Sequence, residues 1–155
     1  PSFSRIMFGI ELYANTCSTY LDKLIKLNNK LLRILQNSPL FVPTKDLYLK
    51  YNTLPINELH EYHLITFVHK FVFHPELLPP VFIRNNYFVF NDQVHQYNIR
   101  NKKDLYINSC NTTFGKRDSR FGAASLWNNL PLSLQNVSSE KLFNNKLKML
   151  FSERL

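Results

Sequence analysis

Apolar positions along the chain recur mainly at helical spacing, and prolines separate the segments that show it. Residues 17–37 are the clearest helical segment. Residues 55–74 form a second one that is apolar on almost all sides, which is typical of a helix at the centre of a core. The same spacing predicts shorter helices over 44–51, 119–129 and 139–152. The pattern therefore predicts a mainly helical protein.

The 17–37 segment carries two distinct rows of side chains. We expect its apolar face to pack against the rest of the protein. The central row of that face consists of Tyr20, Leu24, Leu27, Leu31 and Ile34, and it is flanked by Leu21, Ile25, Leu32 and Leu35. A narrower row beside it is cationic and consists of Lys23, Lys26, Lys30 and Arg33. Such a row is either the solvated face of a surface helix or a track that faces phosphates, and the pattern alone leaves both interpretations open.

Between about residues 85 and 116 the helical signal is weak. Short β-strands are predicted at Tyr87–Phe90 and Leu105–Asn108, with a third around Thr112–Gly115. The predicted fold is therefore mainly α: a helical bundle built on the two long helices, with a small β or irregular insertion and a C-terminal helix. We expect one domain over 1–155, made of helical residues 1–80, an insertion over 81–118 and C-terminal helices over 119–155.

Composition and charge narrow the class of protein. With 45% hydrophobic residues the chain has enough material for a core, which excludes wholesale disorder. Its apolar runs are too short for a membrane helix, which needs about 18 residues, so we expect no membrane partner. The formal charge of +8 favours a polyanionic partner, and nucleic acid first among these. The two cysteines form no disulfide framework, which favours an intracellular compartment, cytoplasmic or nuclear.

The residues that usually carry chemistry form no recognisable catalytic or metal-binding pattern. The histidines of the 55–74 helix, His60, His63, His69 and His74, do not have the spacing of a zinc motif. The eleven acidic residues are scattered, and the three glycines form no phosphate-binding loop. We therefore predict no active site, no metal and no cofactor.

The segment 95–121 combines cations with aromatic residues. Its candidate nucleic-acid contacts are Tyr97, Arg100, Lys102, Lys103, Lys116, Arg117 and Arg120. Cations that neutralise phosphates beside rings that stack on bases are typical of a surface for single-stranded or hybrid nucleic acid. The alternative is a loop whose rings enter the core while its charges remain in water.

Six short motifs, in order along nearly the whole chain, resemble the region that follows the polymerase core in reverse transcriptases of non-LTR retrotransposons of the jockey-like kind. They are Phe8-Gly9-Ile10-Glu11-Leu12-Tyr13, Lys30-Leu31-Leu32-Arg33-Ile34-Leu35, Leu78-Pro79-Pro80-Val81-Phe82, His95-Gln96-Tyr97-Asn98-Ile99-Arg100, the Gly122–Pro131 segment that contains Trp127-Asn128, and Phe143-Asn144-Asn145-Lys146-Leu147-Lys148. The chain departs from the family's usual residues at Tyr13, Ile99 and Asn144.

The resemblance implies a noncatalytic part of an RNA-directed DNA polymerase. The chain has no Asp-Asp pair, so the metal-binding palm and the fingers would lie elsewhere in the parent enzyme. Residues 1–80 would correspond to a thumb-like part, and the partner would be an RNA template or an RNA–DNA hybrid. Two alternatives remain: a structural domain that packs on the polymerase core without touching nucleic acid, or a fragment of a decayed element.

Overall fold

The computed structural model describes residues 10, 14–16, 18–95 and 102–154. Its helices in chain order are α3 (Ser18–Leu35), α4 (Thr44–Lys50), α5 (Ile56–Phe73), the 3-10 helix η1 (Pro75–Leu77), α6 (Pro80–Arg84), α7 (Asn91–Val94), α8 (Thr113–Lys116), α9 (Ser119–Asn128), α10 (Leu132–Gln135) and α11 (Glu140–Arg154). The prediction of a mainly helical bundle with two long helices is confirmed.

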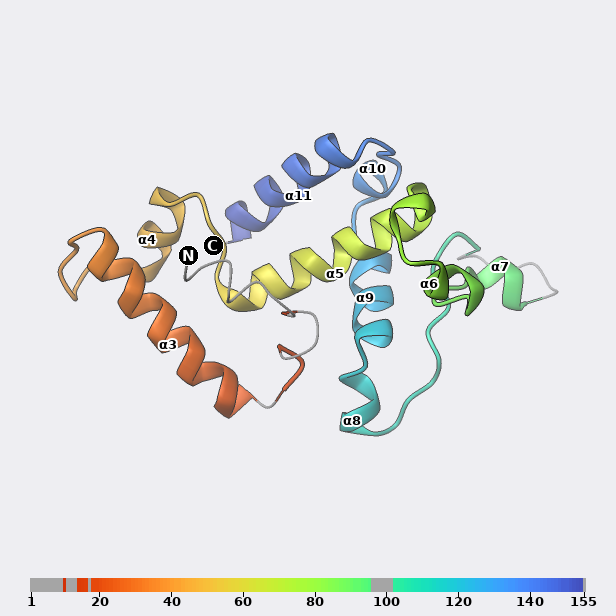
Figure 1. Ribbon diagram of the computed structural model, residues 1–155, viewed down its shortest axis with the longest axis horizontal. Coiled ribbons are helices and arrows are strands. Elements are labelled where there is room, and N and C mark those ends of the chain that lie inside the picture. The colour runs from red at the N-terminus through yellow and green to blue at the C-terminus, as the bar shows by residue number, and fades with distance from the viewer. Residues whose placement is uncertain (1–9, 11–13, 17, 96–101, 155) are drawn as a thin grey trace.

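Helix α5 is the centre of the fold, as its all-round apolar sequence predicted. Figure 1 shows α5 crossing the middle of the molecule, with α11 above it and α9 passing behind it at a steep angle. Helix α9 presents the small residues Ala123 and Ala124 together with Trp127 to this core, and all three are buried. Small side chains let two helices approach closely, so α5 and α9 form the most extensive helix–helix contact.

Helix α11 completes the core with one face of aromatic and aliphatic side chains. Phe143, Leu147 and Phe151 recur at intervals of four and are fully buried. The Phe143 ring stacks on the ring of His69 with centroids 4.0 Å apart, and Trp127 lies 6.0 Å from Phe143. These rings join α5, α9 and α11 in a single cluster.

Three polar contacts join the C-terminal end of α5 to the turn before α11 and to the first residue of α11. His69 Nε2 lies 2.7 Å from the Val137 carbonyl, and His74 Nε2 lies 2.8 Å from the Ser138 carbonyl. Lys70 Nζ lies 3.1 Å from Glu140 Oε1. Because a carbonyl oxygen only accepts hydrogen bonds, Nε2 of His69 must carry its proton. Its Nδ1 is buried with no hydrogen-bond partner among the described residues.

The free energy of unfolding is expected to fall as the pH drops below about 6.5, because of His69. Burial is the main cause that lowers the pKa of this imidazole from its ordinary value, and nearby His74 and Lys70 also lower it, while the Val137 carbonyl and Glu140 act in the opposite direction. The unfolded chain therefore binds a proton at a higher pH than the folded protein, so stability falls as the pH falls. Urea unfolding at about pH 7.5 and 5.5 measures this loss. His69→Gln should show a smaller difference between the two conditions, and an equal difference would contradict the assignment to His69.

The predicted β insertion is wrong in the part of the chain that the structure describes. The described residues between 85 and 116 hold one isolated antiparallel bridge, Phe90 to Leu105, and no strand. The third predicted strand is instead the helical turn α8. Its N-cap is Thr112, whose hydroxyl accepts a hydrogen bond from the Gly115 N–H at 3.1 Å. A Cβ at Gly115 would overlap the sulfur of Cys110, so any larger residue here would displace the Cys110 side chain.

Asn128, at the end of α9, takes the place of a strand partner for Leu105. Its Nδ2 donates to the Leu105 carbonyl and its Oδ1 accepts from the Leu105 N–H, both at 2.9 Å. The Leu105 side chain can therefore enter the core without leaving its backbone groups unpaired. A side-chain amide thus supplies the pairing that a neighbouring strand would give.

Asn128→Leu should lower the free energy of unfolding by about 2–4 kcal/mol, because each of two buried backbone groups left without a partner costs about 1–3 kcal/mol. Urea denaturation followed by circular dichroism measures the change. The matched control is Asn129→Leu. The Asn129 side chain is exposed and donates to the Ser125 carbonyl, so this control should lower the free energy of unfolding by no more than about 0.5 kcal/mol. Equal effects at the two positions would contradict the pairing role.

Candidate nucleic-acid interface

Helix α3 carries the predicted cation row, and the structure shows how the helix ends. Asn37 has a positive φ of 48°, the Asn37 N–H donates to the Ile34 carbonyl, and the Ser38 N–H donates to the Arg33 carbonyl. These two bonds form a Schellman motif, in which asparagine takes the left-handed position that glycine usually holds. The chain then turns back at Pro39, which places Asn37 and Ser38 beside the last turn of the helix.

The rotation of α3 about its own axis is fixed by α4. Asn28 is almost fully buried and donates to the Tyr48 hydroxyl at 2.9 Å, and that hydroxyl donates to Asn29 Oδ1 at 2.6 Å. Leu32 packs with Leu47 and Tyr48 in a small separate core. Burial is the main cause that raises the pKa of Tyr48, so its phenol keeps its proton at neutral pH. The face of α3 that carries Asn28 and Leu32 is therefore the one that packs.

The prediction that the Tyr20–Ile34 row packs against the protein is wrong for its three outermost residues, whereas Leu24 of the row packs against the main core, as do the flanking Leu21 and Ile25. Tyr20, Leu27 and Ile34 are exposed by 68%, 54% and 65%, while Leu24 and Leu31 are half-buried. The physical reason is that a helix can bury either of two neighbouring faces with the same period, and hydrogen bonding to Tyr48 selects the Asn28 face. The cation row lies beyond the exposed apolar row, farther from α4.

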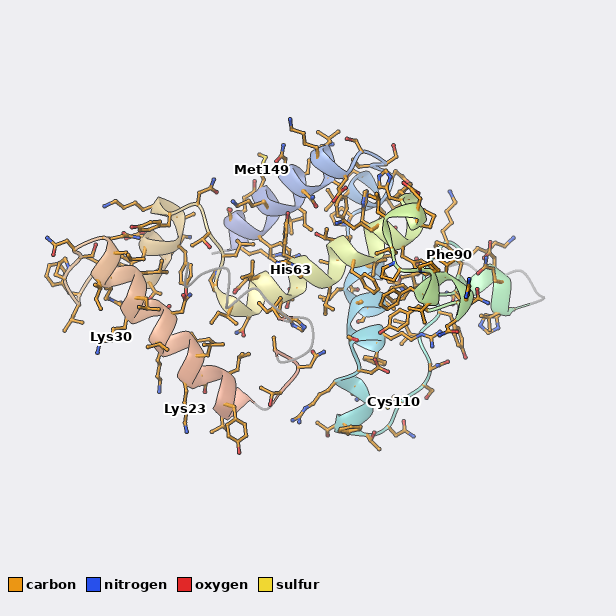
Figure 2. The ribbon with its side chains drawn as sticks, in the orientation of Figure 1. Lys23, Lys30, His63, Phe90, Cys110 and Met149 are labelled. Atoms are coloured by element: carbon orange, nitrogen blue, oxygen red, sulfur yellow. The ribbon has the colours of Figure 1, made fainter. Side chains whose placement is uncertain are left out.

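Three of the four predicted cations on α3 line one groove. Lys26, Lys30 and Arg33 border it together with Asn37 and Ser38, and its volume is about 530 Å³. None of the described residues that line it carries a carboxylate. Figure 2 shows Lys23 and Lys30 extending from the side of α3 opposite to α4, and both are exposed. Arg33 also donates from its guanidinium to the Val42 carbonyl at 3.2 Å, which holds its charge at the groove.

A second groove, of about 820 Å³, lies between the start of α3 and α8. Tyr20 and Leu24 line one side, while Phe114 and Arg117 line the other with Asp118. Phe114 is 86% exposed, and Lys116 and Arg117 are also exposed. The groove therefore places Arg117 opposite the start of α3, and Figure 1 shows α8 facing that end of the helix. Lys116 belongs to the same short helix but does not line the groove.

The remaining predicted contacts of the 95–121 segment lie elsewhere. Arg120 is half-buried; its guanidinium donates to the Asn86 carbonyl at 3.1 Å and lies 5.6 Å from the centre of the Tyr87 ring. Lys102 and Lys103 are exposed and lie beside α7, because the Asp92 N–H donates to the Lys102 carbonyl. Helix α7 and helix α3 lie at opposite ends of the long axis (Figure 1). Tyr97 and Arg100 are outside the described residues.

Two polar residues of the groove, Asn37 and Ser38, were not among the predicted contacts. Their only signal in the sequence is the Asn-Ser-Pro end of the helix, which predicts a turn and does not indicate on which side the turn lies. Their side chains add neutral hydrogen-bonding groups beside three cations. This combination suits a phosphate, whose oxygens accept hydrogen bonds as well as attract charge.

The described residues bring together no three His, Cys, Asp or Glu side chains as metal ligands. Cys110 is half-exposed, and hydrogen bonds to the Thr112 side chain and carbonyl are the main cause that lowers the pKa of its thiol. Among the helices described, none has the length and apolar character needed to cross a membrane. Comparison of the chain with protein-family models, curated proteins and solved structures finds no match.

Proposed function

We propose that this chain is a noncatalytic nucleic-acid-binding part of a reverse transcriptase of the non-LTR retrotransposon kind. It holds the template or the template–product duplex through phosphate contacts. The observation that carries the proposal is the groove of α3, where Lys26, Lys30 and Arg33 meet and no described lining residue is acidic. The resemblance of six ordered motifs supports the parent class of enzyme.

The dimensions of the cation row match a stretch of nucleic-acid backbone. From Lys23 to Arg33 the helix rises about 15 Å, at about 1.5 Å per residue. One strand of a duplex presents a phosphate about every 3.4 Å of axis, so the row spans about four phosphates. Contacts of this kind supply affinity without reading sequence, because phosphates are the same at every base.

A second candidate function is a protein-interaction domain that touches no nucleic acid. The observation that favours it is the exposed apolar row beside the cations, since Tyr20, Leu27 and Ile34 are all more than half exposed. Exposed apolar rows of this size on a helix are typical of surfaces that bind another protein. The two functions use different rows of α3, so a variant can remove one row and leave the other.

Equilibrium binding to an RNA–DNA hybrid, single-stranded RNA and duplex DNA tests the proposal. Fluorescence anisotropy at low salt should give dissociation constants of about 1 μM or tighter, with little dependence on base sequence. Circular dichroism of the same sample confirms that the protein is folded. A folded protein that binds none of the three nucleic acids would contradict the proposal and favour the interaction domain.

A further inference from the structure

The exposed apolar row of α3 has the spacing of a coiled-coil seam. Tyr20, Leu24, Leu27, Leu31 and Ile34 follow one another at intervals of four, three, four and three residues. This is the spacing of alternating d and a positions in a heptad repeat, with Tyr20, Leu27 and Ile34 at d. Those three are also the most exposed side chains of the row. The row is about 21 Å long at 1.5 Å per residue, which is two heptads.

The d positions of the seam are separate from the face of α3 that packs, whereas Leu24 at an a position is half-buried and also contacts the main core. Asn28 and Leu32 point to α4 and are buried, whereas Leu27 and Ile34 remain exposed. The apolar surface also continues beyond the helix, because Leu40 is 88% exposed and borders the same groove as Ile34. A strict a and d row is narrower than the apolar face of an ordinary surface helix, and it matches a single partner helix.

One edge of the seam carries positive charges. In the heptad that places Leu27 at d, Lys23 and Lys30 take the g positions, which are the positions that pair with charges on a partner helix. Figure 2 shows both lysines extending from α3 on its open side. The other edge carries Asn28, whose side chain is already bonded to Tyr48. Lys23 and Lys30 are therefore the residues that would pair with negative charges on a partner helix.

We propose that the α3 seam, formed by Tyr20, Leu24, Leu27, Leu31 and Ile34, binds an amphipathic helix of another protein that carries glutamate or aspartate along the edge facing Lys23 and Lys30. Carboxylates at those positions form ion pairs across the seam, which select the partner and its orientation. This inference goes beyond nucleic-acid binding. It rests on the apolar row, although its charged edge shares Lys30 with the cationic groove.

Charge argues against a second copy of this chain as the occupant. Antiparallel pairing of two α3 helices sets the g positions against each other, so Lys23 and Lys30 would face lysines. Parallel pairing sets them against residues of the other edge, where Asn28 offers no carboxylate. A membrane surface is also disfavoured, because interfacial helices present a broad apolar face and this seam is one side chain wide at each level.

The probe is a designed peptide of about three heptads with leucine at a and d and glutamate at e and g, which repels itself and binds only a basic partner. Fluorescence anisotropy at physiological salt should show saturable binding. The same peptide with lysine at e and g should bind at least about tenfold more weakly. Equal binding of the two peptides, or binding of neither by the folded protein, would overturn the proposal.

Variants identify the surface. Leu27→Asp should weaken binding of the glutamate peptide about tenfold or more. Met149→Asp, which changes another exposed apolar position, on α11, should leave binding unchanged. Lys23→Glu with Lys30→Glu should reverse the preference between the two peptides. The proposal fails if Leu27→Asp binds like the original protein. It also fails if sedimentation shows dimers lost in Leu27→Asp, or if anionic vesicles bind the original protein but not this variant.

The two proposals can fail separately. Lys26 lies on the side of the cation row away from the seam, so Lys26→Glu should weaken nucleic-acid binding and leave the glutamate peptide unaffected. Leu27→Asp should weaken binding of the glutamate peptide and should change nucleic-acid binding only by the small effect of one added negative charge. A variant pair that changes both activities equally would contradict a separate seam.

Discussion

Phe143→Ala is expected to lower the free energy of unfolding by about 3–5 kcal/mol, the range found when a buried phenylalanine is truncated in a core. Phe143 is fully buried, stacks on His69 at 4.0 Å between ring centroids, and lies 6.0 Å from Trp127. Its removal opens a cavity where α5, α9 and α11 meet. Small domains are stable by about 5–15 kcal/mol, so this one change removes a large part of the total.

Urea denaturation measures the change, and two other variants serve as controls. Leu142→Ala truncates the neighbouring side chain, which is 49% exposed, and should cost less than about 1 kcal/mol. Phe143→Leu keeps most of the side-chain volume, so its loss in the free energy of unfolding should lie between those of Phe143→Ala and Leu142→Ala. A loss below about 1 kcal/mol for Phe143→Ala would contradict the central place of this ring in the core.

Lys26→Glu combined with Lys30→Glu is expected to weaken binding to an RNA–DNA hybrid about 100-fold, about tenfold for each reversed charge. Both lysines border the same groove, so each substitution replaces an attraction to phosphate by a repulsion. Arg33 is left intact because its guanidinium also bonds the Val42 carbonyl, and changing it would disturb the turn. Fluorescence anisotropy at about 50 mM salt gives the two dissociation constants.

The matched control reverses the charge of two exposed lysines on a different helix, α11. Lys141 and Lys146 are exposed on α11, so Lys141→Glu with Lys146→Glu changes the net charge by the same amount. If binding depends only on total charge, the two double variants will lose affinity equally. The phosphate groove instead requires a much larger loss in the α3 variant, and equal losses would contradict it.

The helices of the core could be predicted from the sequence because local pattern and tertiary role agree. Helix α5 is apolar on almost all sides, and all its residues except Asn57 are buried or half-buried. Helix α11 places Phe143, Leu147 and Phe151 on one buried face. Proline marks both ends of α5: Pro55 lies immediately before the helix, and Pro75 follows it after one residue, His74. At these positions no distant contact competes with the local signal.

The packing face of α3 could be predicted only in part, because the final rotation of the helix depends on a residue 20 positions away. Periodicity locates an apolar row, but two adjacent rows on α3 have the same period. The choice between them is made by the buried hydrogen bond from Asn28 to Tyr48. A polar residue in the packed face carries no hydrophobic signal. The cation row was located correctly on the helix, whereas its groove depends on the turn at Asn37.

The insertion was mispredicted for a related reason. Clusters of aromatic and β-branched residues favour strands, yet a strand needs a neighbour along its length. Here the neighbour of Leu105 is one asparagine side chain, and the bridge to Phe90 is isolated. The basic residues of this segment separate as a result. Arg117 borders a groove with α3, whereas Lys103 borders a different groove together with Asp92 and Trp127.

The salt dependence of hybrid binding tests the phosphate-binding claim most directly. In a plot of log K against log salt, the original protein should give a steep negative slope, about −0.9 for each phosphate neutralised in a duplex. The slope of the Lys26→Glu, Lys30→Glu variant should be shallower by about two. A flat slope for the original protein, or the same slope for both proteins, would contradict the account.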